Sequence, residues 1–528
     1  MLSDVLKRDW DVVVIGAGLG GGAAGRRLAE VGISVLFLEK GPFAERELRN
    51  ASADDTQIVD RRFWGEPVHG RIDGKAHQFD DTIGTGVGGS SLLYAASLER
   101  PERSDLEDSV ARPHPTGGWP VGYDSFAPYF TEAERLFFVR GTADPLSKDA
   151  SSLLPPLPLR EVDAIMWKTF ARCGLHPYQV HQALKNAEGC LQCFGRVCPR
   201  GCKMDGRTAG VIPALESGNS AVLDHCTVVA LRGEANQIAH VEIERAGERA
   251  AVRAKRYVLA GGGLGSPRLL LASASESWPD GCGNSSGLVG RNLMFHLLES
   301  IAIWPGRRLA PSGPTKALTL RDLYYHKGRR YGVLQSSGLD AGYGEVLHAL
   351  RQHYAGSFIG PDGALRKVMN LPVWLAIAFL GTAKVYRAII EDLPYEANRV
   401  VFDPSRPSRT TFEYTVHTEL RERQLEFRSM LQDRLKLPMM FLTRDIELDL
   451  SHACGTLRFG TDPRSSVLNS ECRFHDIDNL YAADSSFMPT SCGVNPGLLI
   501  AANALRVADA VAASLGHTRE EAHQDFDT

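Results

Sequence analysis

The clearest hydrophobic pattern lies near the start of the chain. Residues 10–15, WDVVVI, form a short apolar run rich in β-branched residues, which predicts a buried parallel strand. A glycine-rich turn follows, and an Ala-, Leu- and Arg-rich stretch then predicts a helix that ends at Val31, before Gly32. A second apolar run, SVLFLE, ends at Glu39. The order of strand, turn, helix and strand predicts a βαβ unit of a parallel sheet.

Later segments carry further patterns. Residues 257–271, YVLAGGGLGSPRLLL, again predict a strand, a glycine turn and a helix. Residues 301–447 predict alternating strands with a long helix near 418–436. The longest apolar run, at 371–381, has about half the length of a membrane span, so it predicts a buried helix or a segment that touches a membrane surface. The polar tail, 516–528, is expected to fray.

The glycines of the first turn have the spacing of a dinucleotide site. Gly16, Gly18 and Gly21 follow the strand in G-x-G-x-x-G order. The first permits a tight turn, the second lets the backbone approach a pyrophosphate, and the third lets the helix pack closely on the sheet. The helix N-terminus adds free N–H groups and a positive dipole end for the phosphates. Glu39, at the end of the second strand, is placed to accept hydrogen bonds from ribose hydroxyls.

Composition adds a few limits to this picture. A chain of 528 residues is expected to form about two to four domains. Lys plus Arg number 59 and Asp plus Glu number 63, so the net charge of −4 argues against a nucleic-acid partner. The N-terminus lacks the pattern of a secretory signal. We therefore expect a cytoplasmic protein, with peripheral membrane contact as an option, whose thiols stay reduced.

A second glycine-rich loop lies at 84–101 and reads GTGVGGSSLLYAASLERP. Within it, Gly88 and Gly89 give a flexible backbone rich in N–H donors, and Ser90 and Ser91 add two hydroxyls. Such a loop suits a phosphate or the polar edge of a flavin. Taken alone, it could equally be a plain glycine-rich turn.

Motifs spread over most of the chain resemble those of the glucose–methanol–choline (GMC) flavoprotein oxidoreductases, and they occur in the order of that family. They are the N-terminal glycine fingerprint, the GGSS loop ending at Arg100-Pro101, GWP at 118–120, LVGRNLMFH at 288–296, the AGGGLGSPRLLL turn, NRVVFDP at 398–404, H-x-x-G-T from His452, and NLYAADSS…NP from 479 onward. Cholesterol-oxidase-like bacterial members are similar to this chain in having a tyrosine at the position of Tyr94. The resemblance therefore points toward that branch.

The resemblance implies an FAD-dependent enzyme with an α/β fold, in which a Rossmann-like FAD-binding domain is combined with a discontinuous α+β substrate-binding domain. The FAD-binding domain is expected at 1–300 and 448–515, with a cysteine-rich insert near 190–203, and the substrate-binding domain at 301–447. Family members with covalent flavin often carry a histidine in the GGSS loop. Because this chain has Leu92 and its neighbours there, we expect non-covalent FAD.

Position by position, the resemblance also implies the cofactor contacts. The ADP half of FAD is expected on the glycine fingerprint and Glu39, with the backbone of Val228 at the adenine. The second glycine loop is expected against the flavin, and Asp484 at the middle of the cofactor. The full expected set is Gly16, Gly18, Gly21, Glu39, Gly88, Gly89, Ser90, Ser91, Tyr94, Val228, Asp484, Asn495 and Pro496.

Oxidation of an alcohol by a flavin removes a hydride and a hydroxyl proton, and the proton needs a base. Histidine suits this task because its unperturbed pKa lies near working pH. The resemblance places the family's active-site histidine at His452 and its second position at Asn495, whose amide would hydrogen-bond the substrate oxygen as negative charge develops. His296 and His475 also lie in family-like motifs, but we expect structural roles for them.

The expected function is therefore FAD-dependent oxidation of a small-molecule alcohol to a carbonyl compound. A redox-neutral lyase or decarboxylase on the same fold is the alternative, because the same pair of side chains would suit it. An oxygen-using sterol or alcohol oxidase is a further alternative. The electron acceptor is expected to be a quinone, a cytochrome or oxygen. The identity of the alcohol is not readable from residues 301–447.

Four of the ten cysteines crowd into one stretch, CLQCFGRVCPRGCK, at residues 190–203. Cys190, Cys193, Cys198 and Cys202 could bind zinc, but their spacing is closer to that of a compact iron–sulfur run. Some GMC dehydrogenases carry a three-iron cluster in a cysteine-rich insert, so the resemblance favours a cluster here. Reduced structural thiols are the alternative. A cluster would carry electrons singly from the flavin to the acceptor.

Overall fold

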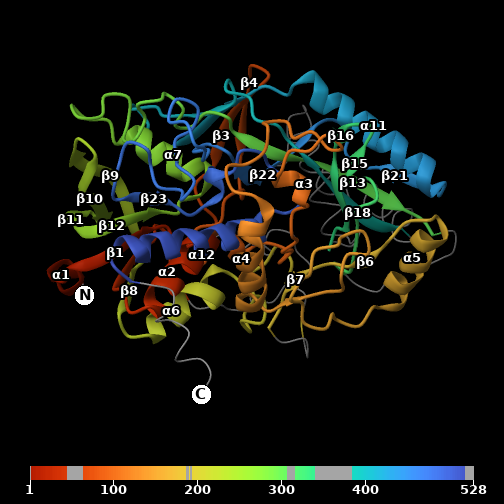
Figure 1. Cartoon of the computed structure of the whole chain (residues 1–528), viewed down its shortest axis with the longest axis horizontal. Helices are drawn as coiled ribbons and strands as arrows, with labels where there is room; N and C mark the ends of the chain where they lie inside the picture. The colour runs from red at the N-terminus through yellow and green to blue at the C-terminus, as the bar shows by residue number, and fades with distance from the viewer. Residues whose placement is uncertain are drawn as a thin grey trace, which may run out of the picture.

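The computed structural model describes residues 2–44, 63–185, 190, 193–305, 315–338 and 383–517. Two main sheets lie side by side, with the N-terminal and C-terminal elements around one of them and α11 beside the other (Figure 1). The apolar run at 371–381 and the tail from residue 518 lie outside the described residues, so the expectations for them stay predictions.

The first sheet has five parallel strands in the order β23-β12-β1-β2-β8. They are β23 (Leu480–Ala482), β12 (Ala254–Leu259), β1 (Trp10–Ile15), β2 (Val35–Leu38) and β8 (Ser220–Leu223). Val12, Val13 and Val14 of β1 are fully buried, which explains the continuous apolar run of a central parallel strand. The predicted βαβ unit is present, and its neighbours in the sheet come from the middle and the end of the chain.

Two helices pack against each other on this sheet. They are α2 (Leu19–Glu30) and α12 (Gly497–Ser514) (Figure 1). By length and composition α12 could cross a membrane, but 67% of it is buried inside the protein. Its apolar sequence is thus that of a core helix. The same side of the molecule contains α4 (Tyr123–Leu136), α6 (Ile212–Glu216), α7 (Gly262–Ala272), the π-helix η4 (Gly206–Val211), and an antiparallel sheet of β9 (Cys226–Glu234), β10 (Gln237–Arg245) and β11 (Glu248–Val252).

The second sheet is antiparallel and has seven strands in the order β21-β13-β18-β17-β14-β6, with β22 also paired to β13. They are β21 (Met439–Phe441), β13 (Met294–Ile303), β18 (Lys384–Glu391), β17 (Gly332–Ser336), β14 (Leu318–Leu320), β6 (Tyr178–Gln179) and β22 (Glu447–Cys454). Residues of β13 on both sides of residue 300 pair with strands of this sheet. The expected domain boundary at residue 300 therefore falls inside one strand.

Alternation along β13 gives the second sheet two different faces. Leu297 and Ile301 belong to a core that includes Phe427 of α11 (Thr418–Leu435). Met294 and Leu298, which point the other way, belong to the core of the first sheet. The long predicted helix thus covers one face, and the opposite face packs into the core of the first sheet.

Smaller elements complete the described structure. A four-stranded sheet joins β19 (Arg399–Val401), β20 (Thr410–Tyr414), β3 (Val68–Ile72) and β4 (Lys75–Phe79), and two ribbons pair β5 (Val139–Arg140) with β7 (Gln182–Ala183) and β15 (Tyr325–His326) with β16 (Arg329–Arg330). The remaining helices are α1 (Leu2–Lys7), α3 (Arg103–Leu106), α5 (Glu161–Arg172), and the 3₁₀ turns η3 (Gly89–Leu92) and η5 (Ser485–Phe487).

Candidate active site

The turn between β1 and α2 requires glycine at two positions. Gly16 has a φ of +104°, and a Cβ there would lie 2.4 Å from the carbonyl oxygen of Ala260. A Cβ on Gly21 would lie 2.0 Å from the carbonyl oxygen of Gly16, so only glycine lets α2 pack on the turn. Gly18 caps α2 without a side-chain hydrogen bond. The first N–H groups of the helix therefore suit a phosphate.

Glu39 is placed beside this turn, but its printed contacts are with backbone. Its Oε2 accepts a hydrogen bond from Ala17 N at 3.0 Å, and its Oε1 accepts from Gly41 N at 2.9 Å and Gly86 N at 3.1 Å. The carboxylate is buried and joins three loops. Its expected contact with a ribose stays a prediction, and its structural role is one that sequence reasoning did not foresee.

The second glycine loop packs directly on the first. Gly88 N donates to the carbonyl oxygen of Ala17 at 2.8 Å, and a Cβ on Gly89 would lie 2.8 Å from Cα of Gly18. The hydroxyls of the two serines hold the loop itself. Ser91 Oγ donates to Gly88 O at 2.5 Å, and Ser90 Oγ accepts from the backbone N–H of residue 84 at 3.0 Å. The loop thus presents backbone rather than serine side chains to a ligand.

Asp484 and Tyr94 are likewise engaged by the protein. Asp484 Oδ1 accepts from Ser486 Oγ and Oδ2 from Ser266 Oγ, both at 2.5 Å, so the carboxylate ties the end of β23 to the start of α7. Tyr94 Oη donates to the carbonyl oxygen of Met204, and burial raises the pKa of this phenol. Val228 lies in β9, and Pro496 caps α12. The expected contacts of these residues with the cofactor stay predictions.

His452 has a partner that we had expected to be structural. Nδ1 of His452 lies 3.1 Å from Nδ1 of His296, and the two rings meet edge to face with their centroids 5.0 Å apart. A register shift makes this contact. Between the pairs Met294–Cys454 and His296–Asp449, β13 advances by two residues while β22 advances by five. The extra residues of β22 form a bulge that brings His452 to His296.

Hydrogen bonds fix the tautomers of both rings. Nε2 of His296 lies 2.9 Å from the carbonyl oxygen of Cys492, which can only accept, so this nitrogen carries a proton. Burial and the neighbouring His452 lower the pKa of His296 to about 3, so its ring is neutral and its Nδ1 is an acceptor. Nδ1 of His452 therefore donates to it. Nε2 of His452 keeps its lone pair and can accept a proton.

Charged groups around His452 tune its basicity. Burial lowers the pKa of His452, the positive charges of Lys316 and Arg387 lower it further, and Asp449 acts in the opposite direction. Oδ2 of Asp449 lies 3.3 Å from Nδ1 of His452. The net shift keeps the ring neutral, and hence able to act as a base, at neutral pH. Sequence reasoning assigned none of these three charged residues to the site. Strand alternation could place Arg387 only once the sheet order was known.

Asn495 is the second predicted catalytic residue and lies directly before Pro496, the N-cap of α12. Its Oδ1 is buried and has no hydrogen-bond partner. An orphaned buried acceptor of this kind calls for a donor from a ligand. Among the described residues no contact joins Asn495 to His452. The assignment of His452 and Asn495 as a catalytic pair acting on one substrate therefore stays a prediction.

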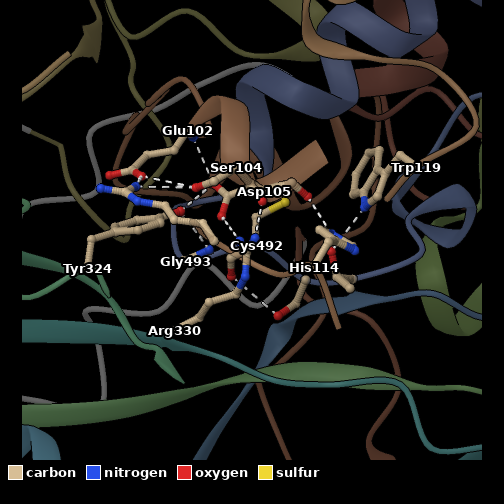
Figure 2. Close-up of polar contacts among 12 residues, drawn as sticks. Glu102, Ser104, Asp105, His114, Trp119, Tyr324, Arg330, Cys492 and Gly493 are labelled. Atoms are coloured by element: carbon tan, nitrogen blue, oxygen red, sulfur yellow. Dashed lines mark hydrogen bonds and ion pairs between the residues drawn. The ribbon is translucent and has the colours of Figure 1, made fainter. Parts of the chain in front are cut away.

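A buried network holds the segment that leads to Asn495 (Figure 2). Tyr324 Oη donates to Asp105 Oδ2 at 2.5 Å and accepts from Gly493 N at 2.9 Å. Arg330 Nη1 donates to Asp105 Oδ1 at 3.0 Å. Burial raises the pKa of Asp105 to about 6. The network fixes the backbone two residues before the orphaned amide, on the same segment that accepts the hydrogen bond of His296.

The cysteine-rich stretch is joined to the second glycine loop by one lysine. Nζ of Lys203 donates to four carbonyl oxygens at 2.6–3.0 Å. Two of them belong to Leu92 and Tyr94, at the end of the glycine loop, and two to Cys193 and Arg196, in the cysteine-rich stretch. Such a set of charge-assisted hydrogen bonds holds the two segments together.

The expected metal site is not supported. Sγ of Cys198 and Sγ of Cys202 lie 3.6 Å apart, and no described cysteine forms a disulfide. Within the described part of the chain, no group of three or more His, Cys, Asp or Glu side chains is placed to hold a metal ion. Cys190, Cys193, Cys198 and Cys202, as the structure places them, therefore do not fit the cluster that their spacing suggested.

Comparison with known proteins agrees with this architecture. Two family models, both described as GMC oxidoreductase, match residues 70–298 and 403–504. The chain is 26% identical to 2-methyl-1,2-propanediol dehydrogenase of Mycolicibacterium austroafricanum, with 94% of each chain covered. It is 24% identical to a cholesterol oxidase of Mycobacterium tuberculosis, covering 95% of this chain and 91% of the relative.

Solved structures share the fold. An FAD-dependent oxidoreductase from Chaetomium thermophilum has a TM-score of 0.63 at 15% identity, and the match covers 97% of this chain and 100% of that chain. The expected fold class, a Rossmann-like α/β domain joined to a substrate-binding domain, is confirmed. The motifs, the sheets and both family models agree, and the chain belongs to the GMC oxidoreductase family.

Proposed function

We propose that this protein uses FAD to oxidise an alcohol to a carbonyl compound, with His452 as the base. The observation that carries the proposal is the chain of hydrogen bonds from Cys492 through His296 to His452, which leaves Nε2 of His452 as an acceptor. Membership of a family of oxidoreductases, and similarity to a diol dehydrogenase, support the same class of reaction.

FAD, when bound, supplies the two-electron acceptor for the C–H bond of the alcohol. The first turn of α2 and its glycines would hold the pyrophosphate, and the second glycine loop would lie against the flavin. Leu92 and Leu93 of that loop are buried against Phe63. Because neither leucine can form a bond to a flavin, we propose that FAD is held non-covalently.

The side chains around His452 account for proton removal. Nε2 of His452 takes the hydroxyl proton of the alcohol, and Asp449, next to Nδ1, stabilises the imidazolium that forms. His296 keeps the ring in the tautomer that exposes the lone pair of Nε2. The positive end of α12 lies behind Asn495 and favours the negative charge that develops on the substrate oxygen. Oδ1 of Asn495 is free to accept from a bound ligand.

Replacement of the base tests this proposal. His452→Ala should keep bound FAD, while anaerobic reduction of the flavin by an alcohol falls by at least ~10². His475→Ala is the matched control, because His475 lies in another family-like motif and contacts Ser466 Oγ at 2.9 Å instead of the base. Unchanged reduction in His452→Ala would remove this residue from the mechanism.

A panel of alcohols separates the proposal from a redox-neutral reaction on the same fold. Bleaching of the flavin by at least one alcohol under anaerobic conditions supports oxidation, and product formation without bleaching supports a lyase. Reoxidation of the bleached enzyme by oxygen, a quinone or a cytochrome then identifies the acceptor. Iron and acid-labile sulfide analysis of anaerobically purified protein examines the cysteine-rich stretch independently of His452.

A further inference from the structure

One face of the second sheet carries polar side chains beside the base. Residues directly opposite each other on neighbouring strands share a face. Arg387 of β18 is opposite Ser300 of β13 and also opposite Gln335 of β17. Ser300 lies four positions along β13 from His296, so these side chains share the face of His296. The other face carries the apolar residues that pack on α11.

Lys316 brings a second positive charge to this region. It is only 8% exposed, and none of the described residues accepts a hydrogen bond from its ammonium group or forms an ion pair with it. Lys316 and Arg387 both lower the pKa of His452, so both cations act on the base. A mostly buried lysine whose ammonium group has no acceptor in the protein leaves that group to a ligand or to water. It therefore marks a position at which a ligand is expected to supply the acceptor.

Two buried amides add hydrogen-bond donors. Nε2 of Gln182 and Nε2 of Gln335 are both buried without a hydrogen-bond partner. Ser97 joins them, since it forms a β-bridge with Gln182 and its hydroxyl donates to Oε1 of Gln335 at 3.4 Å. Gln182 and Lys316 also line one hollow. Gln182, Gln335 and Lys316 thus have N–H groups without an acceptor among the described residues, and Lys316 lies close enough to His452 for its charge to lower the pKa of that ring.

The carboxylates in the same region are already engaged. Asp449 is paired with the base. Asp163, which lines the hollow, lies 3.9 Å from Nζ of Lys384, and buried Glu99 lies 3.4 Å from Arg321. Each acid has a partner other than the ammonium group at position 316. None of these carboxylates forms an ion pair or a hydrogen bond with Lys316, although the charges of Glu99 and Asp449 act to raise its pKa.

Glu447 is the remaining acid near Arg387. Its side chain is exposed to solvent, which screens the attraction between its carboxyl group and Arg387. No hydrogen bond or ion pair joins the two side chains among the contacts of the described residues. The guanidinium group therefore also keeps its donors for a ligand, and guanidinium donors match the paired oxygens of carboxylates and phosphates.

We propose that the substrate is an alcohol that carries an anionic group, a carboxylate or a phosphate, bound by Lys316 and Arg387 with hydrogen bonds from Gln182 and Gln335. The inference rests on the proposed oxidation at His452, because the anionic group holds the substrate while its hydroxyl faces the base. A carboxylate and a phosphate share the chemistry that this site recognises, namely negative charge and several acceptor oxygens.

The test measures binding first, without turnover. FAD-loaded enzyme is titrated with 1,4-butanediol, 4-hydroxybutanoate, 4-hydroxybutyl phosphate and 4-amino-1-butanol, and binding is read from the perturbed flavin absorbance. We expect at least one of the two acids to bind about tenfold or more tightly than the diol, and the amine to bind more weakly than the diol. The two acids distinguish a carboxylate site from a phosphate site. Equal affinities for the acids and the diol would overturn the proposal.

Variants connect the affinity to the proposed donors. Lys316→Met should remove the preference for the acid, raising its dissociation constant about tenfold or more, and Lys316→Arg should restore most of it. Lys148→Met removes an exposed lysine and is the matched control, with unchanged binding expected. If Lys316→Met fails to load FAD, Gln182→Leu provides the same comparison. An acid preference that survives both changes would contradict the site.

The same samples separate this inference from the proposed reaction. If the acids bind preferentially but no alcohol bleaches the flavin, the anion site stands and the proposed oxidation fails. If alcohols bleach the flavin with no advantage for the acids in binding or in rate, the oxidation stands and the anion site fails.

Discussion

Nδ1 of His452 lies 3.1 Å from Nδ1 of His296, although 156 positions separate the two residues in the chain. The contact depends on the pairing of β13 with β22 and on the bulge in β22. If His452 is the base, as proposed, His296 is a positioning residue, because its neutral ring fixes which nitrogen of His452 carries the proton. A hydrogen bond at one nitrogen of an imidazole fixes the orientation of the ring and the tautomer, and so the role of the other nitrogen.

Replacing His296 should slow the reaction without removing the cofactor. We expect His296→Phe to lower the rate of anaerobic flavin reduction about 10- to 100-fold, because His452 loses its acceptor at Nδ1. His296→Gln should recover much of the rate, since an amide can donate to Cys492 and accept from His452. Stopped-flow reduction and FAD content measure both effects. Equal rates for the Phe variant and the wild type would show that the contact does not orient the base.

The pH dependence of flavin reduction should report the charges around the base. His452 has its pKa below 6.5, so the rate should fall only as the pH drops through that lower value and the base is protonated. Asp449→Asn removes the charge that raises this pKa, so the acid limb should move to lower pH. Lys316→Met removes a charge that lowers it, so the limb should move to higher pH.

Opposite shifts are the decisive feature of that experiment. Limiting rates of flavin reduction, measured across the acid range with each variant, separate the electrostatic effect from a general loss of activity. If the acid limbs of the two pH–rate profiles, for Asp449→Asn and for Lys316→Met, moved in the same direction, the assigned effects of the two charges would be contradicted.

The network around Asp105 should contribute measurably to stability. Tyr324→Phe leaves Gly493 N without an acceptor and removes a hydrogen bond from Asp105 (Figure 2). We expect the free energy of unfolding to fall by about 1–3 kcal/mol. Tyr325→Phe, whose hydroxyl makes only a 3.4 Å exposed contact, should change it by less than about 0.5 kcal/mol. Thermal unfolding of the two FAD-loaded variants measures both changes. Equal losses of unfolding free energy in Tyr324→Phe and Tyr325→Phe would refute the role of the network.

Lys203 should matter for cofactor retention. Lys203→Met removes four hydrogen bonds that join the cysteine-rich stretch to the glycine loop, and leaves four carbonyl groups to find other partners. We expect the free energy of unfolding to fall by about 3 kcal/mol and FAD to dissociate at a lower temperature. Flavin fluorescence during heating measures the release. Lys148→Met should leave the release temperature unchanged, and the same result for Lys203→Met would exclude a coupling between the two loops.

The elements that local sequence determines were predictable. The strand at 10–15 matches β1, and the helix near 418–436 matches α11, because periodicity and flanking residues define them within one segment. The site is different, since it depends on strand pairing. Neither the bulge that joins His452 to His296 nor the cross-strand place of Arg387 can be read from spacing along the chain. For Glu39, the position at the end of the second strand was predictable, but its hydrogen bonds to the backbone of neighbouring loops were not.

The order of the strands in the first sheet has a consequence for synthesis of the protein. β1 and α2 are synthesised long before β23 and α12, which complete their surroundings only near residue 514. At about 5–20 residues per second, the N-terminal nucleotide motif therefore waits tens of seconds for its last neighbours. Throughout that time its apolar helix surface stays uncovered. We expect the nascent chain to depend on chaperones during this interval, and cofactor loading to begin only after α12 has been synthesised.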